Sequence, residues 1–154
     1  MSSQPRSDAG AGIGGSDRHR LVVPNRYSEL ERMSEWVRGF AHERRLAREL
    51  AYSLELAVNE VLTNIMSYAY CDDAQHDIVV HLHAQPDRIR IEVEDDGIPF
   101  NPLEVPAEAL PESLEKSRPT GRGILLTRSL MHELHYLRRD DRNVLTMVLH
   151  CAKT

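Results

Sequence analysis

The sequence predicts an α+β fold: a two-layer α/β sandwich in which helices cover one face of a mostly antiparallel sheet. Two observations predict it. Two long segments with apolar residues at helical spacing come first, and two pairs of short alternating segments, each joined by a polar turn, come later. The 154 residues suffice for one domain with a substantial core. The expected order is strand, helix, helix, two strands, a long connection, helix and two strands.

The first half of the chain is expected to hold a short strand and the two long helices. Residues 21–23 are apolar and end at Pro24, which suggests the strand. Ser28 is the expected cap of a helix that runs to about Arg44, and a second helix spans roughly 47–69. Each helix carries an apolar stripe: Leu30, Met33, Trp36, Val37, Phe40 and Ala41 in the first, and Leu54, Val58, Val61, Leu62, Ile65 and Ala69 in the second.

The second half is expected to hold two hairpins and one helix. The helix is expected from Gly123 to about Met131. The hairpin strands alternate at period two and are separated by polar turns. They are 78–84 with 89–93 around the turn 85–87, and 134–137 with 144–149 around the turn 139–143.

Two stretches of the chain are irregular. Residues 1–18 are rich in Ser, Gly, Ala and Asp and cannot bury enough apolar surface to fold, so we expect a disordered tail. Five of the eight prolines fall between residues 99 and 119, which excludes a long helix or a central strand there. A connection of this length is usually a lid, a binding loop or disorder. We therefore expect one domain over residues 19–154, with a mobile lid at about 99–120.

Composition excludes several classes of protein. No run approaches the roughly 18 apolar residues of a membrane span, and the first twenty residues lack the apolar core of a signal peptide, so a cytoplasmic protein is expected. Acidic residues outnumber basic ones, 24 to 19, for a net charge of −5, so nucleic acid is not an expected partner. The two cysteines, Cys71 and Cys151, suggest neither a disulfide framework nor a thiolate metal cluster.

Glu60 and Asn64 lie four residues apart on the second expected helix, so their side chains share one face. They fall at the edge of the apolar stripe, where a carboxylate is costly unless something pairs with it. A metal-bound polar ligand would provide that partner, and the carboxylate could serve as a general base. The alternative is a boundary pair that simply reaches solvent, which is common on amphipathic helices.

The segment 94–100, Glu-Asp-Asp-Gly-Ile-Pro-Phe, directly follows an expected strand. A carboxylate at this position, Asp95, can hold a ligand's amino group, and Gly97 lets the backbone approach a planar base closely. Taken alone, the segment is equally an ordinary acidic turn.

Gly121 and Gly123 precede the last expected helix and would expose its first N–H groups to phosphate oxygens. Arg118 and Arg122 could add charge-assisted contacts to a phosphate. A short G-x-G also serves loop flexibility, and the arginines also suit a solvated basic rim.

Together these features form a more specific pattern than any one of them. The chain offers E-x-x-x-N on a helix, D-x-G after a strand, a Pro-rich connection, and G-x-G before a helix. This order resembles the N, G1 and G2 boxes of the GHKL (Bergerat-fold) ATPases, and more closely the small bacterial anti-sigma factor serine/threonine kinases of RsbW type. The segment 57–64, Ala-Val-Asn-Glu-Val-Leu-Thr-Asn, is similar to their N box. The resemblance runs from about Leu21 to Leu149.

The resemblance implies a role for each matching residue. Asn64 would coordinate the Mg²⁺ that bridges the ATP phosphates, and Glu60 would accept the proton of the attacking hydroxyl. Asp95 would accept a hydrogen bond from the adenine amino group, with Gly97 allowing close approach. The remaining matches are Gly121 and Gly123, which would close the lid over the phosphates with Arg122 nearby, and Thr146, which matches a threonine that supports the adenine end. One departure is Pro99, which replaces the second glycine of the G1 box, stiffens the turn and removes an N–H.

The function implied by the resemblance is an ATP- and Mg²⁺-dependent serine/threonine protein kinase that is also an anti-sigma factor. It would bind a sigma factor, phosphorylate a serine on a STAS-domain anti-anti-sigma antagonist, and form a homodimer. The first alternative is a nucleotide-gated binding module that sequesters a partner without phosphotransfer, which Pro99 leaves open. A second is the catalytic fragment of a histidine kinase, although no helical segment with a phosphoacceptor histidine precedes Leu21.

A third alternative is metal-dependent hydrolysis at some of the eight histidines. The segment 132–135, His-Glu-Leu-His, is one residue short of the zinc-protease pattern H-E-x-x-H, and a third ligand and a general base would still be needed. His81 and His83 alternate on one expected strand, as on an exposed sheet surface.

Overall fold

A computed structural model describes residues 17–101 and 126–151. Its elements, in chain order, are strand β1 (Asp17–Pro24), a 3₁₀ turn (Tyr27–Glu29), helices α1 (Leu30–Glu43) and α2 (Arg48–Tyr68), and strands β2 (Asp77–Gln85), β3 (Arg88–Asp95), β4 (Glu133–Arg139) and β5 (Arg142–His150). Residues 126–130 are helical as well. The α+β fold expected from the sequence is confirmed.

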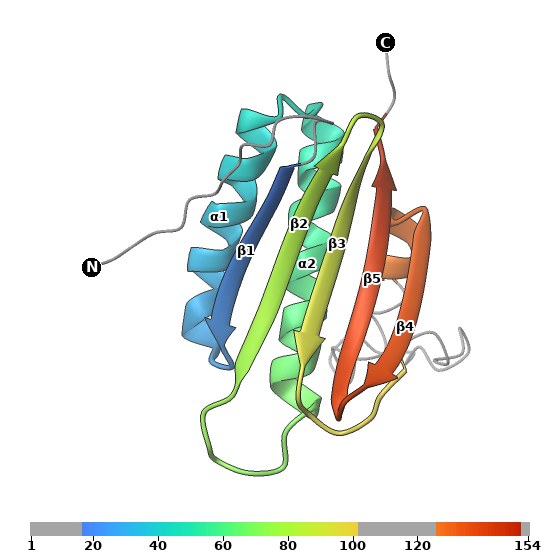
Figure 1. Ribbon diagram of the computed structural model, residues 1–154. Helices are drawn as coiled ribbons and strands as arrows, with labels where there is room; N and C mark the ends of the chain where they lie inside the picture. Colours follow the sequence, from blue (N-terminus) through green and yellow to red (C-terminus); the bar gives the residue numbers. More distant parts are fainter. Residues whose placement is uncertain (1–16, 102–125, 152–154) are drawn as a thin grey trace, which may run out of the picture.

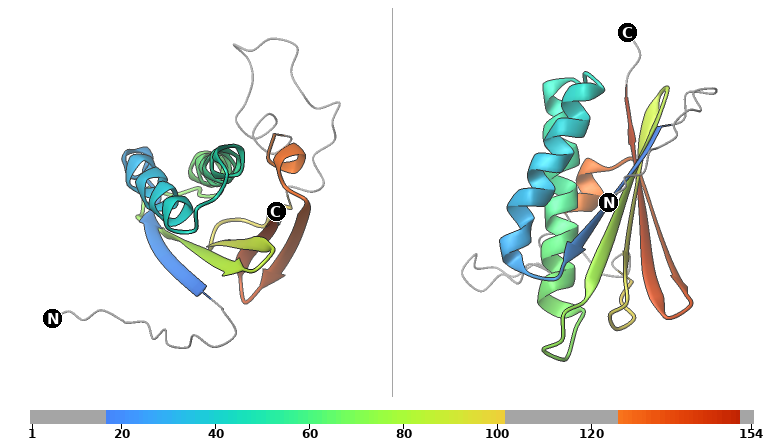
Figure 2. Two further views of the ribbon diagram at one scale, coloured as in Figure 1. Left: turned by 90° about the horizontal axis from the view of Figure 1, so that it is seen from above. Right: turned by 60° about the vertical axis from the view of Figure 1, so that its left-hand side comes forward.

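The five strands form one sheet in the order β1-β2-β3-β5-β4, and every neighbouring pair is antiparallel. In Figure 1 the viewer looks at the sheet with α1 and α2 behind it, and Figure 2 shows both helices on that one side. No helix of the described ranges covers the other side, which we call the open face. The layers are therefore those of a two-layer sandwich.

Strand alternation divides the sheet residues cleanly between the two faces. On β3 and β5, Ile91 and Met147 are paired neighbours that face the helices and are fully buried. Glu92 and Thr146 are the adjacent pair and face the open side. The helices contribute the other side of the core, with Met33 and Val37 from α1 and Leu54, Val58 and Leu62 from α2. The apolar stripes predicted for both helices thus form the core, with Leu30, Trp36 and Ile65 at its margin.

Two local predictions at the start of the chain need correction. Ser28 does not cap α1, because it lies inside the 3₁₀ turn and Glu29 takes the cap position without a side-chain hydrogen bond. The strand predicted at 21–23 begins at Asp17, because its pairing with β2 continues to Asp17 opposite Ala84. Asp17 and Arg18 therefore belong to the sheet and not to the tail expected over 1–18, whose residues 1–16 lie outside the described ranges.

The β4–β5 turn is tighter than predicted. Asp140 and Asp141 both have positive φ, 54° and 62°, as in the two-residue turns that match the twist of a hairpin. Arg139 and Arg142 are consequently paired strand residues, and Asn143 lies within β5 and not in a turn over 139–143. In the described ranges, no helix has both the length and the apolar character needed to cross a bilayer.

Candidate functional site

The carboxyl-terminal half of α2 carries Glu60 and Asn64 on neighbouring turns. Asn64 is buried, at 4% exposure, and within the described ranges its side-chain oxygen Oδ1 has no hydrogen-bond partner. A buried amide oxygen without a partner costs free energy unless a ligand engages it. Mg²⁺ prefers oxygen ligands, so Asn64 fits the role of a magnesium ligand.

Glu60 lies one helical turn before Asn64 and is half-buried. Burial raises the pKa of this carboxyl group above its ordinary value. A carboxylate with a raised pKa is a better proton acceptor near neutral pH, which suits a general base. The pair predicted from the i, i+4 spacing is thus present, and its two members differ in burial.

Asp95 ends β3 and is almost fully buried, at 4% exposure. Its Oδ1 accepts hydrogen bonds from the Gly97 backbone N–H at 2.8 Å and from Asn143 Nδ2 at 2.9 Å. Burial raises the pKa of Asp95, and these two hydrogen bonds oppose the rise. Both bonds end on Oδ1, and the second carboxylate oxygen takes no part in them. That oxygen is the atom suited to a ligand's amino group.

Gly97 is required by the packing of the turn against the end of α2. A Cβ at this position would lie 2.5 Å from the Cβ of Ala69 and closer still to its carbonyl oxygen. The next residue, Ile98, donates its backbone N–H to that same Ala69 carbonyl at 2.8 Å. Gly97 thus allows the acidic turn to dock on the helix that carries Glu60 and Asn64, a reason that the sequence alone did not reveal.

Asn143 is the residue that organises this turn, and it was not identified from the sequence. Its Nδ2 donates to Asp95 and to the Ile98 carbonyl, at 2.9 and 2.8 Å. Its Oδ1 accepts hydrogen bonds from Tyr136, Arg138 and the Phe100 backbone N–H. Arg138 also donates to the Gly97 carbonyl at 2.9 Å. We call Asp95, Gly97, Ile98, Phe100, Tyr136, Arg138 and Asn143 the Asn143 network.

The signal for Asn143 was present in the sequence. Leu145, Met147 and Leu149 form the core face of β5, and the same period-two series reaches back to Asn143. A polar residue that continues a buried series needs partners, and the register places Asn143 directly opposite Asp95. The prediction of a broad turn over 139–143 hid this pattern.

Thr146 is not at the position expected for it. It lies three residues after Asn143, so alternation turns its side chain to the open face, between Glu92 of β3 and His135 of β4. The structure does not bring Thr146 beside Asp95. Asn143, and not Thr146, lies opposite Asp95 and donates a hydrogen bond to it.

The proline that departs from the G1 pattern leaves the turn anchored. Pro99 is exposed, and the backbone N–H groups on both sides of it have partners: Ile98 bonds to Ala69, and Phe100 bonds to Asn143. The proline therefore adds stiffness without breaking either of these hydrogen bonds. Gly121, Arg122 and Gly123 lie outside the described residues, as does most of the expected lid.

The His-Glu-Leu-His segment does not form a helical metal motif. Glu133 begins strand β4, so the helical i, i+3 geometry is absent. His132 accepts a hydrogen bond from the His150 backbone N–H and stacks on the His150 ring, while His135 lies 3.3 Å from Glu133. Both histidines are exposed, and their contacts are those of surface residues.

Comparisons with known proteins identify the family to which the chain belongs. A family model described as a histidine kinase-like ATPase domain matches residues 23–149. The chain is 33% identical over 119 residues to the serine/threonine-protein kinase BtrW of Bordetella bronchiseptica. The matched region covers 76% of this chain and 82% of the relative. It is 27% identical over 124 residues to the serine-protein kinase RsbW of Listeria innocua, and that matched region covers 77% of this chain and 78% of the relative.

A solved structure shares the fold. The crystal structure of the RsbU and RsbW domains of a Mycobacterium tuberculosis protein aligns with a TM-score of 0.62 at 11% identity and covers 90% of this chain. The chain spans 33% of that longer protein. This likeness concerns the fold alone, whereas the family match and the similarity to BtrW extend to sequence. The chain belongs to the histidine kinase-like ATPase domain family and has serine kinases of the RsbW and BtrW type among its relatives.

Proposed function

We propose that this protein is an ATP- and Mg²⁺-dependent serine/threonine protein kinase that also acts as an anti-sigma factor. One observation carries the proposal: the Asp95 turn docks on α2, the same helix that presents Glu60 and the Asn64 oxygen, which has no partner in the part of the chain that the structure describes. A site for a base and a site for a metal-bound phosphate then lie along one helix. The names of the relatives BtrW and RsbW, both protein kinases, support the reaction class.

The adenine end of the site consists of Asp95, Gly97 and Asn143. The carboxylate oxygen of Asp95 that bonds to neither Gly97 nor Asn143 would accept a hydrogen bond from the adenine amino group. Asn143 and the Gly97 N–H hold the carboxylate in place before ATP arrives, which lowers the ordering cost of binding. The low exposure of Asp95 also favours a planar, weakly solvated ligand over bulk water.

The phosphate end consists of Glu60 and Asn64. Mg²⁺, bound through Asn64 Oδ1, would neutralise charge on the phosphates. Glu60 would take the proton from the substrate hydroxyl as the hydroxyl oxygen forms a bond to the γ-phosphorus. The bond from that phosphorus to the bridging oxygen breaks, and ADP leaves with the electron pair. Gly121 and Gly123, which follow the expected lid over about 99–120, would close it over the phosphates, with Arg122 nearby.

The partners follow from the resemblance to anti-sigma factor kinases. We propose a sigma factor as the sequestered protein, a STAS-domain antagonist as the substrate, a homodimeric kinase, and a cytoplasmic location. The domain would include the whole of β1 and span residues 17–154. Phosphorylation would release the antagonist and leave the kinase free to bind the sigma factor, so the two partners exchange according to the phosphorylation state.

Transfer of the terminal phosphate tests the proposal. The purified protein is incubated with γ-labelled ATP, Mg²⁺ and a STAS-domain protein recovered from the native extract by pull-down with and without ATP. The expected result is label on a serine of the STAS-domain protein. If ATP binds and alters which partner is captured while no label is transferred, the protein is a nucleotide-gated binding module instead. If calorimetry with millimolar Mg²⁺ detects no ATP binding, both interpretations are wrong.

A further inference from the structure

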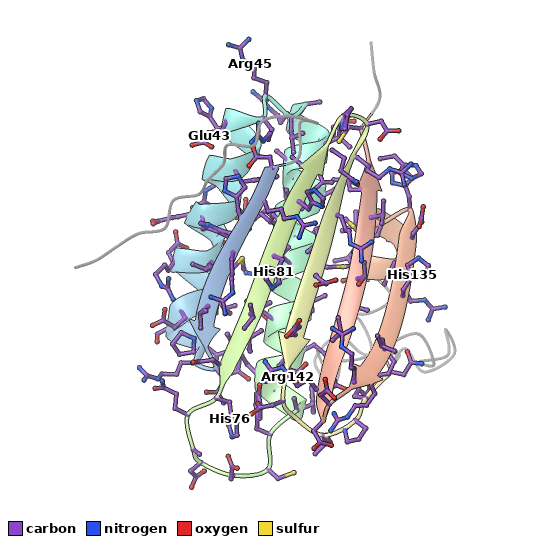
Figure 3. All side chains as sticks on the ribbon, in the orientation of Figure 1. Glu43, Arg45, His76, His81, His135 and Arg142 are labelled. Carbon is purple, nitrogen blue, oxygen red and sulfur yellow. The ribbon has the colours of Figure 1, made fainter. Side chains whose placement is uncertain are left out.

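The open face of the sheet carries a cluster of side chains that the nucleotide site does not use. His81 of β2 lies directly opposite Glu92 of β3, and Glu94 follows Glu92 on the same face. One ligand atom from each of the three side chains lies within 4.8 Å of the other two. Figure 3 shows His81 on the face turned to the viewer, away from the helices. We propose that His81, Glu92 and Glu94 form a binding site for a divalent transition-metal ion of the zinc class.

The burial of the cluster favours a bound cation. All three residues are half-buried, and the side chains of Glu92 and Glu94 are 28% and 22% exposed. Two carboxylates held this close repel each other, and partial burial reduces the screening of that repulsion by water. A divalent cation between them would remove the repulsion. Within the described ranges, His81 makes no side-chain hydrogen bond or ion pair that would compete for its ring nitrogens.

The existing partners of the two glutamates are weak competitors. Arg90 approaches Glu92 at 3.4 Å and Arg142 approaches Glu94 at 3.3 Å, and the arginine side chains are 49% and 35% exposed. Both distances are long for a charge-assisted hydrogen bond, so each ion pair is weak. A metal ion bonded directly to the carboxylates would displace the guanidinium groups into solvent at small cost.

The donor set selects the class of metal. One imidazole nitrogen with two carboxylate oxygens suits Zn²⁺ and similar ions, whereas Mg²⁺ prefers oxygen ligands alone. Three protein ligands leave further coordination positions for water. A hollow of about 350 Å³ on this face, whose lining includes His81, Glu92 and also Arg18 and Arg90, exposes two of the three ligands to solvent.

The site is separate from the nucleotide centre. Glu94 and Asp95 are adjacent in sequence, and alternation turns them to opposite faces of the sheet. The proposal therefore does not depend on the proposed kinase activity. A bound ion would link β2 to β3 and stabilise the folded state by mass action.

Zinc titration of the full-length protein tests the proposal. Protein freed of metal with a chelator is titrated with Zn²⁺ in a calorimeter, without nucleotide and with excess Mg²⁺ present. The parent is expected to bind one tight equivalent. His81→Gln and Glu92→Gln each remove a ligand, so each should lower the zinc affinity by more than about 100-fold. A loss of about 100-fold is the upper end for removing a residue that only hydrogen-bonds to a metal ligand. Zn²⁺ should also raise the melting temperature of the parent and not that of His81→Gln.

His83→Gln is the matched control, because His83 lies two residues further along the same strand and on the same face. It is expected to keep the tight equivalent, which separates this site from general binding by surface histidines. Melting curves without zinc establish that each variant folds. The proposal is overturned if the parent binds no tight equivalent, if His81→Gln binds zinc as the parent does, or if His83→Gln loses as much affinity as His81→Gln.

Discussion

The two ends of the candidate nucleotide site differ in how completely the protein satisfies its own polar groups. At the adenine end, Asn143 engages both its amide nitrogen and its amide oxygen within the folded chain. At the phosphate end, the Asn64 oxygen is equally buried and has no partner within the described ranges. The proposed adenine end is thus organised by the protein's own hydrogen bonds, whereas the proposed phosphate end offers a buried oxygen to a ligand.

This difference predicts that substitutions at the two ends fail in different ways. Changes in the Asn143 network should disturb the folded protein and the affinity for ATP together. Changes at Glu60 or Asn64 should leave the protein folded, or even more stable. They should remove phosphotransfer or the dependence of ATP binding on Mg²⁺. The predictions below separate these outcomes, beginning with the largest expected effect.

Glu60→Gln should abolish phosphotransfer and spare ATP binding. The amide keeps the size and polarity of the side chain and cannot accept the proton, so the transfer rate should fall by about 10²–10⁴-fold, as for loss of a general base. Labelled-phosphate transfer and ATP calorimetry on the same preparation measure the two properties. Transfer at the parental rate would show that Glu60 is not the base.

Gly97→Ala should destabilise the protein and weaken ATP binding together. The new Cβ would collide with the Ala69 backbone, so the turn must move away from α2. The free energy of unfolding should fall toward the upper end of the about 1–3 kcal/mol typical of overpacking. Chemical denaturation measures the loss.

Gly39→Ala is the control for Gly97→Ala. Gly39 lies within α1, and a Cβ added there meets nothing within 4 Å. This variant should be more stable than the parent by about 0.5–1 kcal/mol, because alanine favours a helix interior. Equal effects of the two substitutions would contradict the docking of the turn on Ala69.

Asn143→Ala and Thr146→Val compare two residues of the same strand. Asn143→Ala leaves Asp95 and Tyr136 without a shared partner and should cost about 1.5 kcal/mol of stability as well as ATP affinity. Thr146→Val keeps the shape of a residue on the open face and should leave the ATP affinity unchanged. The reverse result would restore Thr146 to the adenine end and remove Asn143 from it.

The differences between the predicted and observed structures show which parts of the protein the sequence could predict. The helices, both hairpins and the Glu60–Asn64 pair were predictable because they depend on local periodicity. The place of Thr146 was missed, because the broad turn expected over 139–143 hid Asn143 as the strand residue that continues the core face of β5. The two aspartates at positive φ shorten that turn, and one residue of strand register decides which face a side chain occupies.

The role of Gly97 was only half predictable for a related reason. Its motif indicated a close approach, and the partner was expected to be a planar base. The close contact in the folded chain is with Ala69, which lies far away in the sequence. Contacts of this kind between elements arise from packing and leave no local pattern.

Asn64→Leu should have the opposite effect on stability from Asn143→Ala. It replaces a buried amide, whose oxygen has no hydrogen-bond partner among the described residues, with an apolar side chain of similar size, so the ligand-free protein should gain up to about 1 kcal/mol. The dependence of ATP binding on Mg²⁺ should be lost at the same time. Denaturation without nucleotide and ATP calorimetry with and without Mg²⁺ measure both. A large loss of stability would show that the Asn64 oxygen already has a partner in the ligand-free protein.

The smallest expected effect is a pH dependence caused by Glu60. Burial raises the pKa of this carboxyl group, so the charged form is less stable in the folded protein than in the unfolded chain. The parent therefore loses stability relative to Glu60→Gln at a pH above the raised pKa, and this loss disappears as the pH falls through the raised pKa toward the ordinary value for glutamate. Melting temperatures of both proteins, followed from neutral to acidic pH, should converge. A gap that stays constant or widens on acidification would mean that Glu60 is not desolvated, and the argument for its basicity would fail with it.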